Sequence, residues 1–157
     1  MRYNEIQYID NKIIAVTACL ILFVHAIVAI VVNDMQGTIL LACITAIIIG
    51  LIIVFHRRFS LTVNITAAGI ECDIKGGIVQ KISRADIESI EIKQLQALKQ
   101  FGGWGIRYNT ATKTKGYIFG GKHYLLLHYG KGQKLAVSIK HPAAAKEQLQ
   151  LLQYPVH

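Results

Sequence analysis

The sequence lacks charge over most of its first third. No Asp, Glu, Lys or Arg occurs in residues 13–32 or 38–55, and the one strongly polar side chain in either run is His25. As helices, these runs of 20 and 18 residues would measure about 30 Å and 27 Å, the hydrocarbon thickness of a bilayer. We therefore expect two transmembrane helices, at residues 13–32 and 38–55.

Cysteine is also scarce, with three residues in a chain of 157. No CxxC or HxxxH spacing occurs, so the sequence does not indicate a zinc site. Cys19 and Cys43 would differ in depth by about 12 Å, too far for a disulfide, and Cys72 stands alone. We expect reduced thiols, no metal and no cofactor.

The sequence contains no recognisable catalytic pattern. There is no GxSxG, and the GxxxxGK spacing at residues 116–122 places His123 where a phosphate-binding loop needs Ser or Thr. A strand rather than a helix is expected to follow it. His123 and His128 are expected on opposite faces of that strand. We expect no catalytic residue and no enzyme activity.

Two alternatives to membrane spans exist for the apolar runs. A buried core helix would need a large protein around it, and only about 100 residues follow the second run. A cleavable signal peptide would end near His25, but the apolar stretch continues to residue 32 and a second one follows. Both observations favour a pair of spans.

The basic residues predict the orientation of these spans. Arg2 and Lys12 precede the first span and Arg57 and Arg58 follow the second, whereas residues 33–37 contain no Lys or Arg. Basic residues near span ends stay on the cytoplasmic side. We expect a multi-pass protein of the cell membrane with an outer turn at residues 33–37. Both termini, including an N-terminal segment of residues 1–12, are expected in the cytoplasm.

Small residues predict where the helices touch. Ala42, Ala46 and Gly50 recur every four residues on the second helix, and Ala15 and Ala18 begin a similar stripe on the first. Small residues let membrane helices approach closely. We expect these faces to meet, either within the hairpin or between two copies of the chain.

His25 is the one strongly polar side chain of the first span, and placing an ionisable group inside a bilayer costs free energy. Counted from the outer ends of the two spans, it lies at the same depth as Thr45. A neutral imidazole bonded to the Thr45 hydroxyl would be a structural pair, and a proton relay or metal site is the alternative. No second His, Asp or Glu lies at that depth, which favours the structural interpretation.

After Arg58 the pattern changes to short alternating runs separated by glycine, which is typical of antiparallel strands. We expect about seven strands, a long turn at residues 109–116, and a helix that begins at Pro142. The fold class is then α+β: a two-helix hairpin precedes a bent antiparallel β-sandwich or barrel, and a C-terminal helix closes its core.

Residues 102–107, with the sequence GGWGIR, and residues 135–139 before the closing helix resemble bacterial pleckstrin-homology-like (PH-like) membrane proteins. The acidic residue before Ile87 in the segment 82–90 resembles the same family. The resemblance covers residues 59–153 and implies a PH-like domain without shared catalytic residues. Some members are similar to bacteriocin-immunity proteins, so immunity or envelope-stress protection is the alternative function.

Positive charge is concentrated after the spans, where 15 of the 17 Lys and Arg but 6 of the 9 Asp and Glu occur. A solvated face is one interpretation, and nucleic-acid binding is disfavoured because no aromatic stacking platform is evident. We expect a membrane-anchored binding or scaffold module that engages lipid headgroups or a protein partner, with homo-oligomers left open. The expected headgroup residues are Arg57, Arg58, Lys113, Lys115, Lys122, Lys131 and Lys134.

Overall fold

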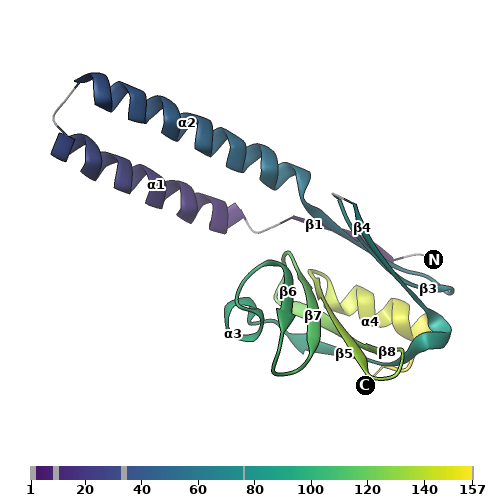
Figure 1. Ribbon diagram of the computed structural model, residues 1–157. Coiled ribbons are helices and arrows are strands. Elements are labelled where there is room, and N and C mark those ends of the chain that lie inside the picture. The colour runs from purple at the N-terminus through teal and green to yellow at the C-terminus, as the bar shows by residue number, and fades with distance from the viewer. Residues whose placement is uncertain (1–2, 9–10, 33–34, 76, 157) are drawn as a thin grey trace. The chain divides into compact units, whose positions relative to one another are not determined.

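The computed structural model describes residues 3–8, 11–32, 35–75 and 77–156. The chain divides into two compact units. The helical unit is residues 10–58, and the β unit combines residues 1–9 with residues 59–157. The class is α+β, as expected: two helices, two sheets and a C-terminal helix (Figure 1).

The helical unit contains α1 (Asn11–Val32) and α2 (Met35–Arg58). Helix α2 begins before the expected span and continues beyond it to Arg58, so Met35, Gln36 and Gly37 of the expected outer turn are helical.

Sheet A consists of four antiparallel strands in the order β1-β2-β3-β4. Its first strand was not expected, because in it the polar Glu5 and Gln7 point inward while the apolar Ile6 points outward. A half-buried strand is recognised in a sequence by apolar residues at its inward positions, and here those positions are polar. The strands are β1 (Tyr3–Tyr8), β2 (Ser60–Ile65), β3 (Gly69–Ile74) and β4 (Ile78–Ser83).

Sheet B has five strands in the order β5-β8-β9-β7-β6. The expectation of antiparallel strands throughout is wrong here, because β7 and β9 pair in parallel. This pairing makes both strands enter the sheet at the same end. The 3₁₀ turn Arg84–Asp86 leads into the sheet, whose strands are β5 (Ile87–Gln94), β6 (Gly105–Asn109), β7 (Thr114–Ile118), β8 (His123–Tyr129) and β9 (Gln133–Ile139).

The expected long turn at residues 109–116 is also wrong, because β7 begins at Thr114. The Asn109 side chain shortens the turn: its Oδ1 accepts the backbone N–H of Thr112 at 3.1 Å. The short helix α3 (Ala97–Phe101), between β5 and β6, had no signal in the sequence pattern. It lies on the outer face of sheet B, where Phe101 packs with Ile118 and Tyr124.

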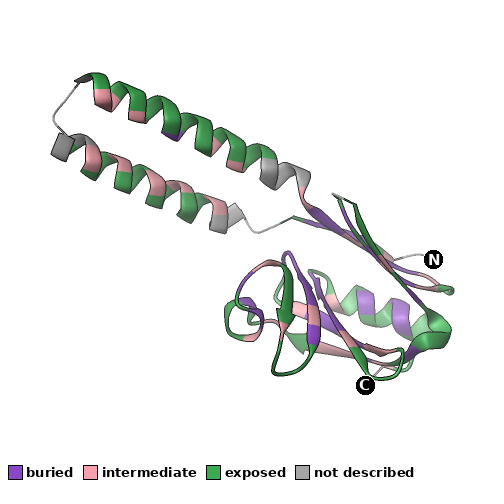
Figure 2. Cartoon of the chain, viewed as in Figure 1, coloured by how far each residue is buried: buried purple, intermediate pink, exposed green. Residues whose placement is uncertain are grey.

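The main core lies between the inner faces of the two sheets (Figure 2). Helix α4 (Pro142–Leu151) begins at the expected proline and contributes Ala145 and Leu149 to this core. Tyr154 follows the helix and donates its hydroxyl to the Thr66 carbonyl at 2.8 Å. Cys72 is fully buried here, and this burial raises the pKa of its thiol to about 12.

Candidate functional site

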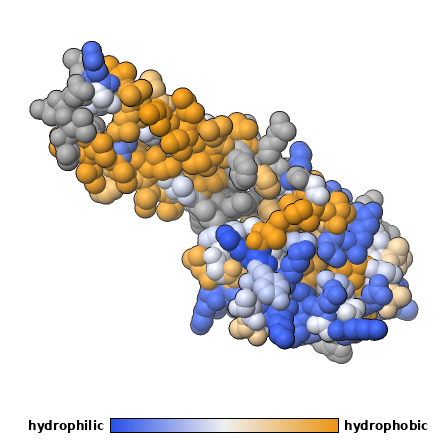
Figure 3. Space-filling model, viewed as in Figure 1, coloured by the Kyte–Doolittle hydropathy of each residue, from blue (hydrophilic) through white to orange (hydrophobic). Residues whose placement is uncertain are grey.

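Apolar side chains cover the outside of the helical unit (Figure 3). Leu20 and Leu51 are each 63% exposed, and Phe23 is 66% exposed. Within the described part of the chain, one helical segment is long and apolar enough to cross a membrane, Gln36–Val54 in α2. The apolar segment found in α1, Ile14–Val28, is shorter.

A polar contact joins α1 to α2 in the middle of these apolar surfaces. His25 Nδ1 lies 2.9 Å from Thr45 Oγ1. This is the pair indicated by counting depth from the two span ends. Thr45 is buried by the contact, so one hydroxyl and one ring nitrogen satisfy each other between the helices.

The stripe of Ala42, Ala46 and Gly50 does not face α1. All three residues are exposed, and a Cβ placed on Gly50 would meet nothing within 4 Å. The more covered side of α2 carries Leu41, Thr45 and Ile49 instead. Contact through the small residues inside the hairpin is therefore wrong, because the His25–Thr45 bond sets a different rotation of α2. Contact between two copies stays a prediction.

The helical unit is inserted between two strands that pair with each other. Tyr8, the last residue of β1, lies opposite Ser60, the first residue of β2, and the ladder runs on to Tyr3 opposite Ile65. The chain thus leaves the β unit and returns to it at neighbouring positions. We call this end of the β unit the junction end.

Buried polar side chains attach β1 to the rest of the β unit. Glu5 Oε1 accepts the backbone N–H of Lys140 at 2.7 Å, and Oε2 accepts that of His141 at 3.2 Å. These donors lie just before α4, where the helix dipole favours a negative charge. Gln7 donates to the Ser138 carbonyl at 2.5 Å, and Ser138 Oγ donates back to Gln7 Oε1 at 2.8 Å.

Three lysines lie at the junction end. The backbone N–H of Lys75 donates to the Ser60 carbonyl, and Lys122 belongs to the Gly120-Gly121-Lys122 loop that packs beside Tyr8. A Cβ on Gly120 would lie 3.1 Å from the Tyr8 carbonyl oxygen and 3.3 Å from Lys140 Cε. The exposed lysines of this end are Lys75, Lys122 and Lys140.

Glycine is required in that loop. Gly121 has a φ of +82°, and a Cβ there would overlap the carbonyl oxygen of Ile139. The loop therefore lies close over the end of β9. Because His123 pairs with Ile139, the neighbouring residues Lys122 and Lys140 lie at the same end of the β8–β9 ladder. Of the three junction lysines, sequence reasoning identified Lys122 alone.

Most of the expected headgroup lysines lie at the opposite end of sheet B. The parallel β7–β9 pair places the β6–β7 and β8–β9 turns together there, and Thr114 pairs with Lys134. Lys115 Nζ lies 5.1 Å from the centre of the Tyr117 ring. The side chains of Arg57 and Arg58 fall outside the described residues. This far end carries Lys113, Lys115, Lys131 and Lys134.

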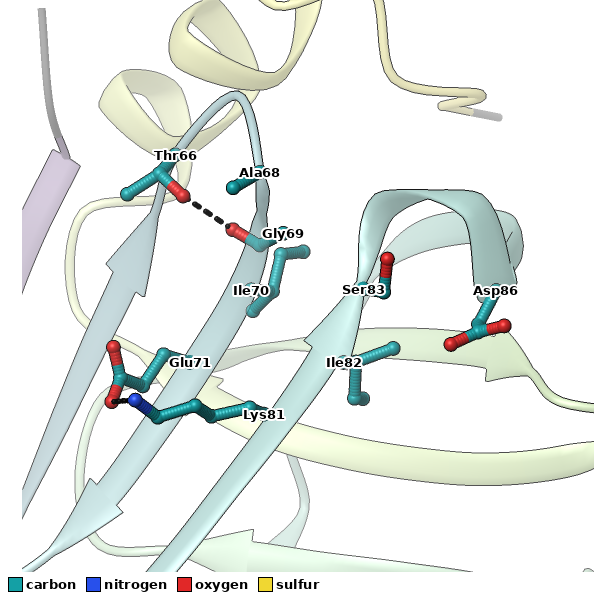
Figure 4. Close-up of a pocket in the computed structure, with 9 residues that line it drawn as sticks. All are labelled: Thr66, Ala68, Gly69, Ile70, Glu71, Lys81, Ile82, Ser83 and Asp86. Carbon is teal, nitrogen blue, oxygen red and sulfur yellow. Dashed lines mark hydrogen bonds and ion pairs between the residues drawn. The ribbon is translucent and has the colours of Figure 1, made fainter.

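A hollow of about 420 Å³ lies near the β2–β3 turn and the end of β4 (Figure 4). Its polar side chains are largely paired with one another: Lys81 Nζ lies 3.0 Å from Glu71 Oε1, and Thr66 Oγ1 donates to the Gly69 carbonyl at 3.0 Å. Paired groups of this kind offer a ligand little, so we assign this hollow no function.

No group of three or more His, Cys, Asp and Glu side chains suited to a metal occurs among the residues that the structure describes. No protein-family model, curated protein or solved structure matches the chain. The resemblance to PH-like domains therefore stays a prediction.

Proposed function

We propose that this protein is a membrane-anchored binding module, held by a two-helix hairpin and carrying its β unit on one side of the bilayer. One observation carries the proposal: a pair of helices with exposed apolar side chains is inserted between two paired strands of a unit that has its own buried core. Exposed apolar surface of that extent is unfavourable in water, and the hydrocarbon core of a bilayer would surround every side of the two helices.

The pairing of β1 with β2 supports two crossings. Strands in one ladder lie on the same side of a membrane, so the chain between Tyr8 and Ser60 must cross an even number of times. If Gln36–Val54 crosses, α1 must cross as well. Helix α1 has 22 residues and would measure about 33 Å, which is sufficient. The basic flanks at Arg2, Lys12, Arg57 and Arg58 favour the cytoplasm for both termini.

The junction end is the part of the β unit next to the bilayer in this proposal, because the helices start there. Lys75, Lys122 and Lys140 then engage anionic lipid headgroups. Each lysine near an anionic surface contributes about 1 kcal/mol. The carboxylate beside them, Glu5, is buried and bonded to backbone amides, so it opposes this attraction less than an exposed acid would.

The β1–β2 ladder also dictates how this proposal is tested. Removal of residues 1–58 would delete β1 together with Glu5 and Gln7. A better variant replaces residues 10–58 with Asn-Gly, because Tyr8 and Ser60 already lie opposite each other and Asn-Gly favours a tight hairpin turn. Circular dichroism and Trp104 fluorescence would first show that this variant is folded.

Co-flotation with vesicles then measures headgroup binding by this hairpin-free variant. We expect binding to vesicles that contain anionic lipid, weakening as salt rises. Replacing Lys75, Lys122 and Lys140 together by Gln should lower the affinity about a hundredfold, since three lysines are worth about 3 kcal/mol.

The matched control replaces the far-end lysines Lys113, Lys115 and Lys131 by Gln, which removes the same charge from the same unit. A larger loss in this control would assign headgroup binding to the far end, as the sequence alone predicts. Equal binding of the unsubstituted variant to neutral vesicles would contradict any role for charge.

A further inference from the structure

A second hollow, of about 290 Å³, lies on the outer face of sheet B. Residues of the five strands of sheet B, of α3 and of the β6–β7 turn line it. Its volume is close to the lower limit of about 300–1,000 Å³ for small-molecule sites. The hollow belongs to the β unit alone, so it does not depend on the proposed membrane hairpin.

Aromatic and aliphatic side chains form one part of this hollow. The rings of Phe101 and Tyr124 meet edge to face, with their centres 5.8 Å apart and their planes at 87°. Leu126 lies on the same strand face as Tyr124. Phe101 reaches the sheet because residue 116 is glycine: a Cβ there would lie 2.8 Å from Phe101 Cδ1.

A row of polar side chains crosses the sheet at the other part of the hollow. Lys134 lies opposite His128 on β8 and opposite Thr114 on β7, and Thr114 lies opposite Asn109 on β6. Thr114 Oγ1 donates to the Thr112 carbonyl at 3.2 Å, and Asn109 Nδ2 donates to the Gln100 carbonyl at 2.6 Å. These two bonds fix the polar wall of the hollow and use the Thr114 hydroxyl proton and one of the two Asn109 amide protons.

Two donors in the hollow have no hydrogen-bond acceptor. Lys134 Nζ has no hydrogen bond or ion pair with any residue that the structure describes. His128 Nε2 is buried without a hydrogen bond, although it lies 3.2 Å from Glu91 Oε1. The Glu91 carboxylate is thus within ion-pair distance of this nitrogen but outside hydrogen-bond geometry, so the ring N–H can still donate a hydrogen bond to a ligand.

The one carboxylate of the hollow is already balanced. Glu91 Oε2 lies 2.8 Å from Lys93 Nζ, and this hydrogen bond, with a further contribution from His128, lowers the pKa of Glu91. Lys134 is then left as an uncompensated positive charge. Lys113, in the β6–β7 turn at the same end of the sheet, adds to the positive potential that attracts anions, whereas the Glu88 carboxylate, which accepts the Lys131 N–H at 3.1 Å, offsets the charge of Lys131.

We propose that this hollow binds a small anion, a phosphate or carboxylate, that carries an apolar group. The anion pairs with Lys134 and His128, and the apolar group lies on Phe101, Tyr124 and Leu126. The arrangement matches the usual composition of small-molecule sites, in which apolar contacts supply area and a few polar groups fix orientation.

Calorimetric titration of the full chain in neutral-lipid nanodiscs tests this proposal, with phenyl phosphate as the probe. Phenyl phosphate should bind at least about tenfold more tightly than inorganic phosphate, which lacks the apolar group, and than phenol, which lacks the charge. Lys134→Gln and His128→Gln should each weaken phenyl phosphate binding about tenfold, because each removes a charge-assisted hydrogen bond.

Lys146→Gln is the matched control, since it removes an exposed lysine of α4 that does not line the hollow and should leave the affinity unchanged. Absence of saturation at about 10 mM phenyl phosphate, or equal affinities of the Lys134→Gln and Lys146→Gln variants, would overturn the proposal. Repeating the titration with anionic lipid in the nanodiscs identifies the source of the anion. Competition by the lipid assigns the site to a headgroup, and unchanged binding assigns it to a soluble anion.

Discussion

The two units place the same kinds of side chain in opposite surroundings. Leu125, Leu127 and Leu135 of the β unit are 0% exposed, whereas Leu20 and Leu51 of the helical unit are 63% exposed. Burial of a leucine from water stabilises a fold by about 1.5–3 kcal/mol. The β unit gains this from its own core. The helical unit gains it only from an apolar solvent, as in the proposed bilayer.

The two units also differ in how their buried polar side chains are hydrogen-bonded. In the helical unit, His25 and Thr45 form a polar contact between α1 and α2. In the β unit, the Glu5 carboxylate accepts hydrogen bonds from Gln7 and from the backbone of Lys140 and His141. The packed core of the β unit thus holds a buried network of several hydrogen bonds, whereas the contact between the helices is a pair of groups that satisfy each other.

The largest expected effect is the loss of stability on replacing a buried leucine of the β unit, compared with replacing an exposed leucine of the helical unit. Leu135→Ala should destabilise the β unit by about 2–5 kcal/mol, because it leaves a cavity in a fully packed core. Leu51→Ala should cost less than about 1 kcal/mol, because its side chain contacts solvent rather than core. Denaturant unfolding of the full chain in detergent, followed by Trp104 fluorescence and by helical circular dichroism, measures both. Equal losses would remove the distinction between the units.

The second effect compares the polar contacts. Glu5→Ala should cost about 1–3 kcal/mol, since it leaves buried donors without an acceptor. Thr45→Val should cost about 0.6 kcal/mol, the usual value for a hydrogen bond between membrane helices. Thermal unfolding of each variant gives the comparison. Asn4→Ala, an exposed neighbour in β1, is the control for Glu5 and should change little; a loss as large as that of Glu5→Ala would show that β1 itself, not the carboxylate, is responsible.

The effect that is smallest at neutral pH concerns the thiols. Cys72 has its pKa raised to about 12 by burial, whereas an unfolded thiol titrates near about 8.5. Between these values the folded state keeps a proton that the unfolded state loses, so the stability of the β unit should fall as pH rises above about 8.5. The slope of unfolding free energy against pH should be shallower in Cys72→Ala than in the unsubstituted chain. Cys19→Ala, which changes an exposed thiol of α1, should leave that slope unaltered.

Much of the architecture could be predicted from local pattern. The β-rich region after Arg58, the helix that begins at Pro142 and the partnership of His25 with Thr45 depend on periodicity, on a proline or on a count of depth. Strand β1 was not predicted because its inward side chains are the polar Glu5 and Gln7, and because the consecutive polar residues Asn4 and Glu5 interrupt any alternation in the sequence. Helix α3 is five residues long, too short for a helical period to show.

The candidate sites were less predictable. Lys122 and Lys134 look alike in the sequence, both beside glycine turns, yet they lie at opposite ends of sheet B. Lys75 and Lys140 gave no signal, because they lie near the junction end only through the pairing of β2 with β3 and the packing of Gly120 against Tyr8.

The sequence by itself determined the two apolar helices and the change to alternating strands after them, because both follow from side chains near one another along the chain. Tertiary structure alone decided that β1 joins the sheet across 51 intervening residues, since Tyr8 pairs with Ser60. It also decided which lysines share an end, because the parallel register of β7 and β9 is set by contacts between distant strands. Pairing of that range depends on the packing of the whole core, and no short stretch of sequence carries that information.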